Sequence, residues 1–235
     1  MAGDPVGAFD LVIFDCDGVL VDTEPTATRV LVAMLATVGI TMTDAEVLQT
    51  FVGRSAAAAL TIIEERLGSP LPSSFLGEWH TQLFAEFHRG VAPMPDVVTV
   101  LDALDAGGLP TCVASSGGHD RMRLTLGTSG LLPRFDGRLF SATEVPRGKP
   151  FPDVFLHAAR RMGVLPERAV VIEDSVAGVT AGVAAGMTVF GYTAGAHSDP
   201  AELTAAGART FAFMAELPAL LGATSFAERP PIPPL

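Results

Sequence analysis

The stretch FDLVIFDCDGVLVD, residues 9–22, joins a short apolar run to three acidic residues. The run Leu11–Phe14 has no polar position, which is typical of a parallel strand covered on both faces. Asp15, Asp17 and Asp22 follow it closely. Neighbouring carboxylates repel one another and lose hydration when buried, so a hydrophobic core alone does not favour them. We therefore expect a bound cation, or a reaction that uses the acids, at the end of this strand.

Similar apolar runs recur along the chain and alternate with helical patterns. The predicted strands are Leu11–Phe14, Thr111–Ala114, Ala169–Ile172 and Thr188–Phe190. Helices are predicted over Val97–Ala106, which Gly107 and Gly108 would end, and over Ser175–Ala185, which Gly186 would end. Strands that alternate with helices indicate an α/β fold with a doubly wound, Rossmann-like parallel sheet.

Residues 23–92 break this alternation, because they contain helical patterns and no convincing strand. Pro25 suits the first turn of a helix and Gly39 its end, and Thr43 and Glu46 have the spacing of a capping box. Two further helices are expected, over Ser55–Leu67 and Ser73–Phe87. The sequence thus predicts an α-helical cap over 23–92, inserted into a core formed by 1–22 and 93–224, and a proline-rich tail over 225–235.

Composition restricts the partners and the compartment. With 235 residues, 49% of them hydrophobic, the chain can form one large domain or a core with a smaller satellite. A formal net charge of −11 disfavours nucleic acid and anionic membrane surfaces as partners. The first residues lack the regions of a signal peptide, and no apolar run reaches the roughly 18 residues that span a bilayer. We expect a cytoplasmic protein, a monomer or a weak dimer, in which Cys16 and Cys112 are buried free thiols.

Polar residues follow three of the four predicted strands, at the edge where a parallel sheet binds its ligands. They are Asp15 and Asp17, then Ser115 and Ser116, then Glu173 and Asp174. Lys149 adds an ammonium group from RGKPFPDVF, just before a predicted helix. This set suits phosphoryl transfer through a covalent aspartate. Asp15 would attack phosphorus, and Asp17 would protonate the leaving alkoxide and then activate water.

Mg²⁺ is the expected cofactor, because hard cations prefer oxygen ligands and usually keep several waters. The expected ligands are Asp15, the backbone carbonyl of Asp17, and Asp174, with Glu173 beside them as a direct or a water-mediated ligand. Lys149 would neutralise charge on the phosphoryl oxygens, which Ser115 and Ser116 would orient. The partner would be a small-molecule phosphate ester.

The segments DCDGVLVD, VASSGG, GKPFPDVF and VIEDSVAG occur in this order along nearly the whole chain. Their order and spacing resemble the four motifs of the haloacid dehalogenase-like hydrolases. The chain is most similar to the branch of beta-phosphoglucomutase, 6-phosphogluconate phosphatase and other sugar phosphatases, which carries a helical cap. The resemblance implies that Asp15 is the nucleophile and Asp17 the general acid/base. It also implies that Ser115 and Lys149 bind phosphate and that Asp15, Asp17 and Asp174 hold magnesium.

Two residues are candidates for contact with the rest of the substrate. Arg54, in the glycine turn FVGRS before a predicted cap helix, could reach an anionic group of the substrate. His119 lies beside the second motif and could touch the substrate as well. For Arg54, an exposed arginine near a helix start is an equally good explanation. For His119, a surface histidine is a better one.

The sequence leaves three functions open. The expected one is a phosphatase for a sugar or sugar-acid phosphate. A beta-phosphoglucomutase-type isomerase is an alternative, although Ala56 and Ala27 stand where such mutases carry an arginine and a histidine. A receiver-like phospho-switch also combines strand-end acids, a hydroxyl and a lysine, but such modules are shorter and have no helical insert.

Overall fold

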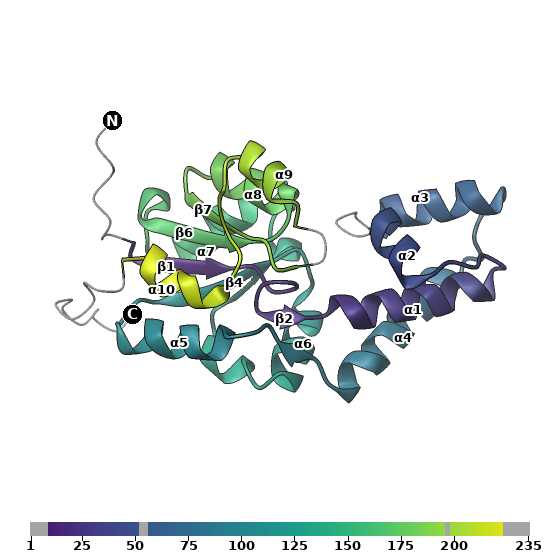
Figure 1. Ribbon diagram of the computed structural model, residues 1–235, viewed down its shortest axis with the longest axis horizontal. Coiled ribbons are helices and arrows are strands. Elements are labelled where there is room, and N and C mark those ends of the chain that lie inside the picture. The colour runs from purple at the N-terminus through teal and green to yellow at the C-terminus, as the bar shows by residue number, and fades with distance from the viewer. Residues whose placement is uncertain (1–8, 52–55, 196–197, 223–235) are drawn as a thin grey trace.

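The computed structural model describes residues 9–51, 56–195 and 198–222, so the predicted tail over 225–235 lies outside the described residues. Within them, six parallel strands form one sheet in the order β5-β4-β1-β6-β7-β8. The strands are β1 (Leu11–Phe14), β4 (Thr111–Ser115), β5 (Leu139–Ser141), β6 (Ala169–Glu173), β7 (Thr188–Tyr192) and β8 (Arg209–Phe211). The predicted α/β fold with a doubly wound parallel sheet is confirmed (Figure 1).

Helices cover both faces of this sheet. Alternate residues of a strand point to opposite faces, and in β1 Val12 and Phe14 belong to one buried cluster, Leu11 and Ile13 to the other. The helices of the first face are α5 (Val97–Ala106), α6 (His119–Thr128) and α10 (Leu217–Leu220), and those of the second are α7 (Asp153–Arg161), α8 (Val176–Ala184) and α9 (Pro200–Ala205). The run Leu11–Phe14 is fully buried on both sides, which explains its unbroken apolarity.

The two edge strands, β5 and β8, were not predicted. Each has three residues, and β8 exposes Arg209 and Thr210. An edge strand pairs on one side only and is partly solvated, so it needs no continuous apolar run. The predicted helix over Ser175–Ala185 is observed as α8, with Ser175 as its N-cap, where the Ser175 hydroxyl accepts the Gly178 N–H.

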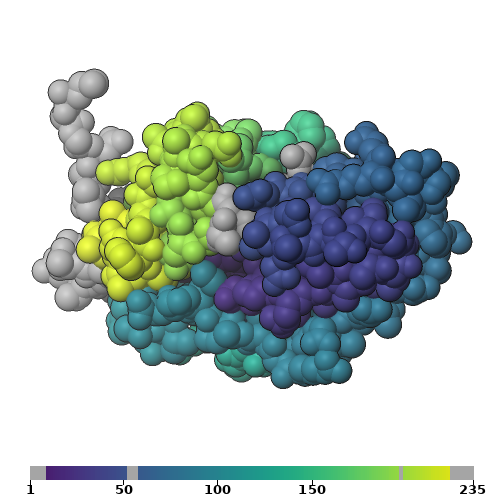
Figure 2. All heavy atoms as spheres, turned by 45° about the vertical axis from the view of Figure 1, so that its right-hand side comes forward, coloured from purple at the N-terminus to yellow at the C-terminus, as the bar shows by residue number. Residues whose placement is uncertain are grey.

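Four helices of the described chain lie between β2 (Val21–Asp22) and β3 (Ala92–Pro93), which pair antiparallel. They are α1 (Glu24–Thr37), α2 (Asp44–Phe51), α3 (Ala56–Leu67) and α4 (Phe75–Arg89). In Figure 1 they form a separate lobe beyond the end to which the β1 arrow points. Figure 2 shows the purple and blue surface of this lobe beside the teal to yellow surface of the core. The lobe thus lies on the side of the carboxyl ends of the strands, where ligands of such sheets bind.

Local signals within this lobe agree with the sequence. The Thr43 N–H donates to Glu46 Oε2 at 2.7 Å, and the Glu46 N–H donates to Thr43 Oγ1 at 3.3 Å, so the predicted capping box is present. Pro25 lies in the first turn of α1, and Gly39, with φ +83°, follows its end. Helix α4 begins and ends two residues after the predicted Ser73–Phe87.

Two expectations about the environment of the chain can be compared with the structure. Cys16 and Cys112 are free and buried, and burial raises the pKa of both thiols. Among the described helices, none combines the length and apolarity needed to cross a bilayer.

The packing of α5 predicts a contrast between two substitutions. Leu101, 1% exposed, lies in the buried cluster of the first face, whereas Val98 on the same helix is 41% exposed. Leu101→Ala should lower the free energy of unfolding by about 2–5 kcal/mol, because it leaves a cavity. Val98→Ala, the matched control, should change it by less than about 0.5 kcal/mol. Urea denaturation of both variants measures the difference, and equal losses would contradict this packing.

Candidate active site

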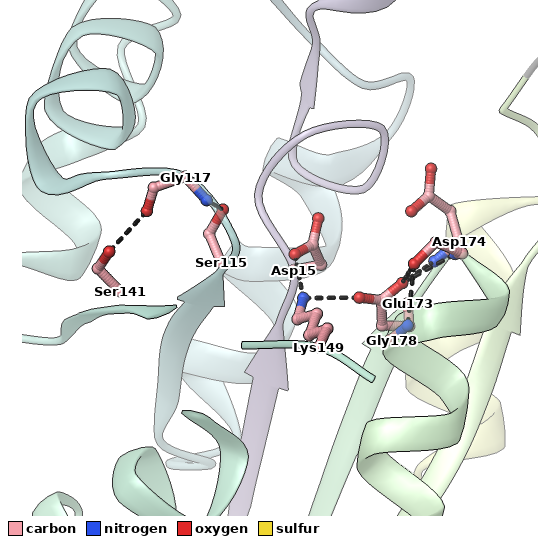
Figure 3. A network of polar contacts seen from close by, with 9 residues as sticks. Asp15, Ser115, Gly117, Ser141, Lys149, Glu173, Asp174 and Gly178 are labelled. Carbon is pink, nitrogen blue, oxygen red and sulfur yellow. Dashed lines mark hydrogen bonds and ion pairs between the residues drawn. The ribbon is translucent and has the colours of Figure 1, made fainter. Parts of the chain in front are cut away.

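A buried lysine joins two acids at the carboxyl edge of the sheet (Figure 3). Lys149 Nζ contacts Asp15 Oδ1, just after β1, and lies 2.6 Å from Glu173 Oε1 at the end of β6. The Lys149 and Glu173 side chains are 4% and 1% exposed, and that of Asp15 is 11% exposed. The ammonium also lies 4.9 Å from the centre of the Phe155 ring on α7. The structure thus brings together three of the predicted site residues from three separate segments.

These charges perturb one another. Burial alone would lower the pKa of Lys149, but Asp15 and Glu173 outweigh it and hold that pKa above its ordinary value. Burial raises the pKa of Asp15 to about 7, despite the opposing effect of Lys149. One ammonium therefore does not compensate for the acids gathered here, because desolvation disfavours each carboxylate.

Glu173 uses both of its carboxylate oxygens. Oε1 faces Lys149, and Oε2 accepts the Asp174 and Ser175 N–H groups, each at 2.8 Å, and the Ser175 hydroxyl at 2.9 Å. A Cβ at Gly178 would lie 1.7 Å from Glu173 Oε1, so only glycine lets this carboxylate rest against the first turn of α8. Of the two roles left open for Glu173, the arrangement favours a water-mediated one over direct metal ligation.

Asp174 points away from Glu173 (Figure 3). A Cβ at Gly18 would lie 2.1 Å from Asp174 Oδ2, and one at Gly195 would lie 3.4 Å from it. Gly18 has φ +80°, which side chains rarely adopt, so this position requires glycine for two reasons. Burial, followed by repulsion from Glu173 and Asp15, raises the pKa of the Asp174 carboxyl well above its ordinary value.

The donor set suits a divalent cation. Among the residues that the structure describes, the Asp174 carboxylate receives no hydrogen bond or ion pair, although it lies near Asp15. The same part of the chain has no three His, Cys, Asp or Glu side chains gathered as a metal site. A cation would therefore rely on the carboxylates of Asp15 and Asp174, a backbone carbonyl such as that of Asp17, and water. Mg²⁺ favours such a set, because it prefers oxygen ligands and keeps several waters.

Asp17 has two partners that the sequence reasoning missed. Its Oδ1 accepts the Thr23 hydroxyl at 2.8 Å and lies 3.2 Å from Arg121 Nη2. Thr23 directly follows the acidic stretch, and Arg121 lies in the first turn of the helix that begins after the serines. Their positions in the sequence could have identified them, because the first turn of a helix that follows a strand lies near the carboxyl ends of the strands.

The serine loop lies between β4 and α6. Ser115 is 2% exposed, and its hydroxyl oxygen accepts the Gly117 N–H at 3.0 Å. The Ser141 hydroxyl at the end of β5 donates to the Gly117 carbonyl at 2.8 Å (Figure 3). The Ser116 side chain is exposed. The loop is therefore held from both sides and leads into the N-terminus of α6, where free backbone N–H groups favour anions.

The structure describes one of the two candidates for substrate contact, His119. His119 Nε2 lies 2.8 Å from Glu144 Oε1, and the same oxygen accepts the Ser141 N–H at 2.6 Å. His119 thus pairs with Glu144, in the short 3-10 turn that follows β5, and not with Asp15 or Asp174. Arg54 lies outside the described residues.

Comparison with known proteins agrees with this geometry. Residues 9–186 match the family model of the haloacid dehalogenase-like hydrolases. The chain is 32% identical to the 6-phosphogluconate phosphatase of Escherichia coli strain K12, over 90% of this chain and 94% of that protein.

Two solved structures are similar as well. One is a haloacid dehalogenase-like protein of unknown function from Agrobacterium tumefaciens, with TM-score 0.82 and 38% identity, over 92% of this chain and 99% of that one. The other is a HAD-family hydrolase from Deinococcus radiodurans with bound phosphate and sodium, with TM-score 0.79 and 35% identity, over 93% of this chain and 97% of that one. With its four motifs meeting at one edge of the sheet, the chain belongs to the haloacid dehalogenase-like hydrolase family.

Proposed function

We propose that this enzyme hydrolyses a small sugar or sugar-acid phosphate through an aspartyl-phosphate intermediate, with Mg²⁺ as its cofactor. The chain is a phosphoric monoester hydrolase, in keeping with its family and its phosphatase relative. The observation that carries the finer proposal is the Asp15 carboxylate, which the buried Lys149 ammonium holds at the open end of β1. A fixed carboxylate beside a cation is what a nucleophile toward an anionic phosphate needs.

In the first step, an Asp15 carboxylate oxygen attacks phosphorus, and the bond between phosphorus and the ester oxygen breaks. Asp17 gives its proton to the departing alkoxide, so the alcohol leaves neutral. In the second step, Asp17 takes a proton from water, which attacks phosphorus. The bond between phosphorus and the Asp15 oxygen breaks, which releases inorganic phosphate and the free Asp15 carboxylate.

The other residues hold the phosphoryl group. Lys149 would neutralise a phosphoryl oxygen, and the Ser115 hydroxyl would donate to another while it still accepts the Gly117 N–H. A magnesium ion at Asp15 and Asp174 would supply the remaining positive charge as a Lewis acid. The similar Deinococcus protein has bound phosphate and sodium, which supports an anion and a cation as ligands of this fold.

The substrate class is proposed from the cap and from one relative. The residues around Asp15 can hold only the phosphoryl group, so the remainder of the substrate must meet helices α1–α4. The Escherichia coli relative is named for 6-phosphogluconate. We accordingly propose a sugar or sugar-acid phosphate for this enzyme, which acts as a monomer or weak dimer and binds neither nucleic acid nor membranes. We also propose a catalytic core formed by 1–22 and 93–224 and a cap over 23–92, because helices α1–α4 form a lobe separate from the sheet.

Replacement of the proposed nucleophile should stop turnover. Asp15→Asn should lower kcat at least ~10⁴-fold, as loss of a covalent nucleophile does in other enzymes, because the amide cannot form an acyl phosphate. Asp22→Asn, in the β2–β3 ribbon, is the matched control and should retain activity within about threefold. Phosphate release and acid-trapped labelled phosphoprotein measure both variants. An active Asp15→Asn enzyme would contradict the mechanism.

Removal of metal should stop turnover too. Excess chelator should abolish phosphate release, and added Mg²⁺ should restore it, because the buried acids need a further cation. Asp174→Asn should raise the Mg²⁺ concentration for half-maximal activity by about tenfold or more. Full activity in excess chelator would reject the cofactor.

Hydrolysis should exceed isomerisation. The sequence has Ala27 and Ala56 at the two positions where beta-phosphoglucomutases hold a second phosphate, so water should reach the intermediate first. With beta-glucose 1-phosphate and its 1,6-bisphosphate, free phosphate should form faster than glucose 6-phosphate. Isomerisation that is about a hundredfold faster than phosphate release, or ~2.7 kcal/mol in barrier, would replace the phosphatase by the mutase.

A further inference from the structure

Arg121 connects the serine loop, Asp17 and the cap. Its stem passes the loop, since a Cβ at Gly117 would lie 3.4 Å from Arg121 Cδ. Its Nη2 lies 3.2 Å from Asp17 Oδ1, and its Cζ lies 5.2 Å from the centre of the Phe87 ring, near the end of α4. One guanidinium thus contacts an acid of the core and an aromatic ring of the cap.

The surroundings of Arg121 stabilise this orientation of its guanidinium group. Asp17 is the main cause that raises the pKa of Arg121, against the opposing effect of burial. Arg121 Nε is buried and has no hydrogen-bond partner among the described residues. An unsatisfied buried donor costs about 1–3 kcal/mol, so the contacts of the guanidinium with Asp17 and Phe87 must offset that cost. A planar guanidinium can stack on a ring and still direct its edge toward a carboxylate.

The contacts of Asp17 distinguish its two carboxylate oxygens. Thr23 and Arg121 both reach Oδ1. In the described part of the chain, Oδ2 has neither of these partners and is the oxygen left for proton transfer. Thr23 precedes α1 and Phe87 lies near the end of α4, so the contacts reach the start and the end of the cap.

We propose that Arg121 is a positioning residue. It holds Oδ1 of Asp17 so that Oδ2 faces the leaving oxygen, and Phe87 of the cap keeps its guanidinium in place. The inference rests on the proposed function, because it takes Asp17 as the acid that protonates the leaving group.

The test compares two leaving groups. The phenolate of 4-nitrophenyl phosphate leaves without a proton, whereas the alkoxide of 6-phosphogluconate, or of whichever sugar or polyol phosphate the wild type hydrolyses fastest, needs one. Rapid-quench measurement gives the rate of phosphoenzyme formation for each. In Arg121→Met this rate should fall ~30–100-fold for the alkyl phosphate and less than about threefold for the nitrophenyl ester, since general acid catalysis contributes 10²–10⁴-fold.

Controls separate positioning from general disturbance. Arg123→Met removes an exposed arginine from the same helix and should leave both rates within about twofold. Arg121→Lys keeps the charge and should restore part of the alkyl rate. Phe87→Leu should show the same selectivity for leaving group at a smaller magnitude, about three- to tenfold.

The outcomes are distinct. Equal losses for the two substrates in Arg121→Met, or no loss, would overturn the positioning role. A Phe87→Leu enzyme without a selective loss would overturn the contribution of the cap. If Arg121→Met does not fold, Arg121→Lys decides, because a loss equal for both substrates overturns the role and a selective loss supports it. Failure of the proposed function would appear in the wild type itself, as absence of phosphoenzyme with either substrate.

Discussion

The buried contact of Lys149 with Asp15 and Glu173 is the interaction on which the site depends. Charges removed from water are costly unless they are paired and hydrogen-bonded, and loss of one partner of a buried pair costs about 3–5 kcal/mol. The three residues come from three separate segments, so the ammonium holds the ends of β1 and β6 and the segment before α7 in register. The sheet already places β1 beside β6, with Phe14 opposite Ile172. The pairing of strands thus brings the acids together, and the positive charge of Lys149 offsets the repulsion between them.

Glu173 has a structural role in the site and no direct role in the proposed reaction. Its oxygens are occupied by Lys149 and by the N–H groups that begin α8. This arrangement turns the adjacent Asp174 toward Gly18, and its carboxylate has no hydrogen bond or ion pair among the described residues. Burial, and then repulsion from Glu173, raise the pKa of Asp174, and a cation bound there would offset this effect because an opposite charge favours ionisation.

Sequence patterns predict the parts of this protein that repeat or lie close in the chain. Strands β1, β4, β6 and β7 were predicted because burial on both faces excludes polar residues, whereas the short edge strands β5 and β8 carry no such pattern. The predicted acids and serines follow strand ends and were proposed as site residues on that basis, whereas Lys149 was proposed from the segment before α7. Arg121 was missed because its partner Asp17 lies far away in the sequence, and hydrophobic periodicity does not indicate contacts between such distant residues. The position of His119 in the sequence indicated that it lies beside the serine loop. It did not indicate that the imidazole ring contacts Glu144.

The cap contacts Asp17, the proposed acid/base residue. Thr23, at the entry to the cap, donates to its carboxylate, and Phe87, near the exit, contacts it through Arg121. A displacement of the cap relative to the core must then alter at least one of these contacts, because the Thr23–Asp17 hydrogen bond is directional and the Phe87 ring lies 5.2 Å from Arg121 Cζ. Among the described residues, the side chains that contact Asp15 and Lys149 come from the core and not from the cap. Under the proposed mechanism, phosphate binding and nucleophilic attack can thus stay constant while the orientation of Asp17 responds to what the cap encloses. Under the proposed mechanism, the cap would select a substrate not only by fit but also by whether Asp17 stays correctly oriented.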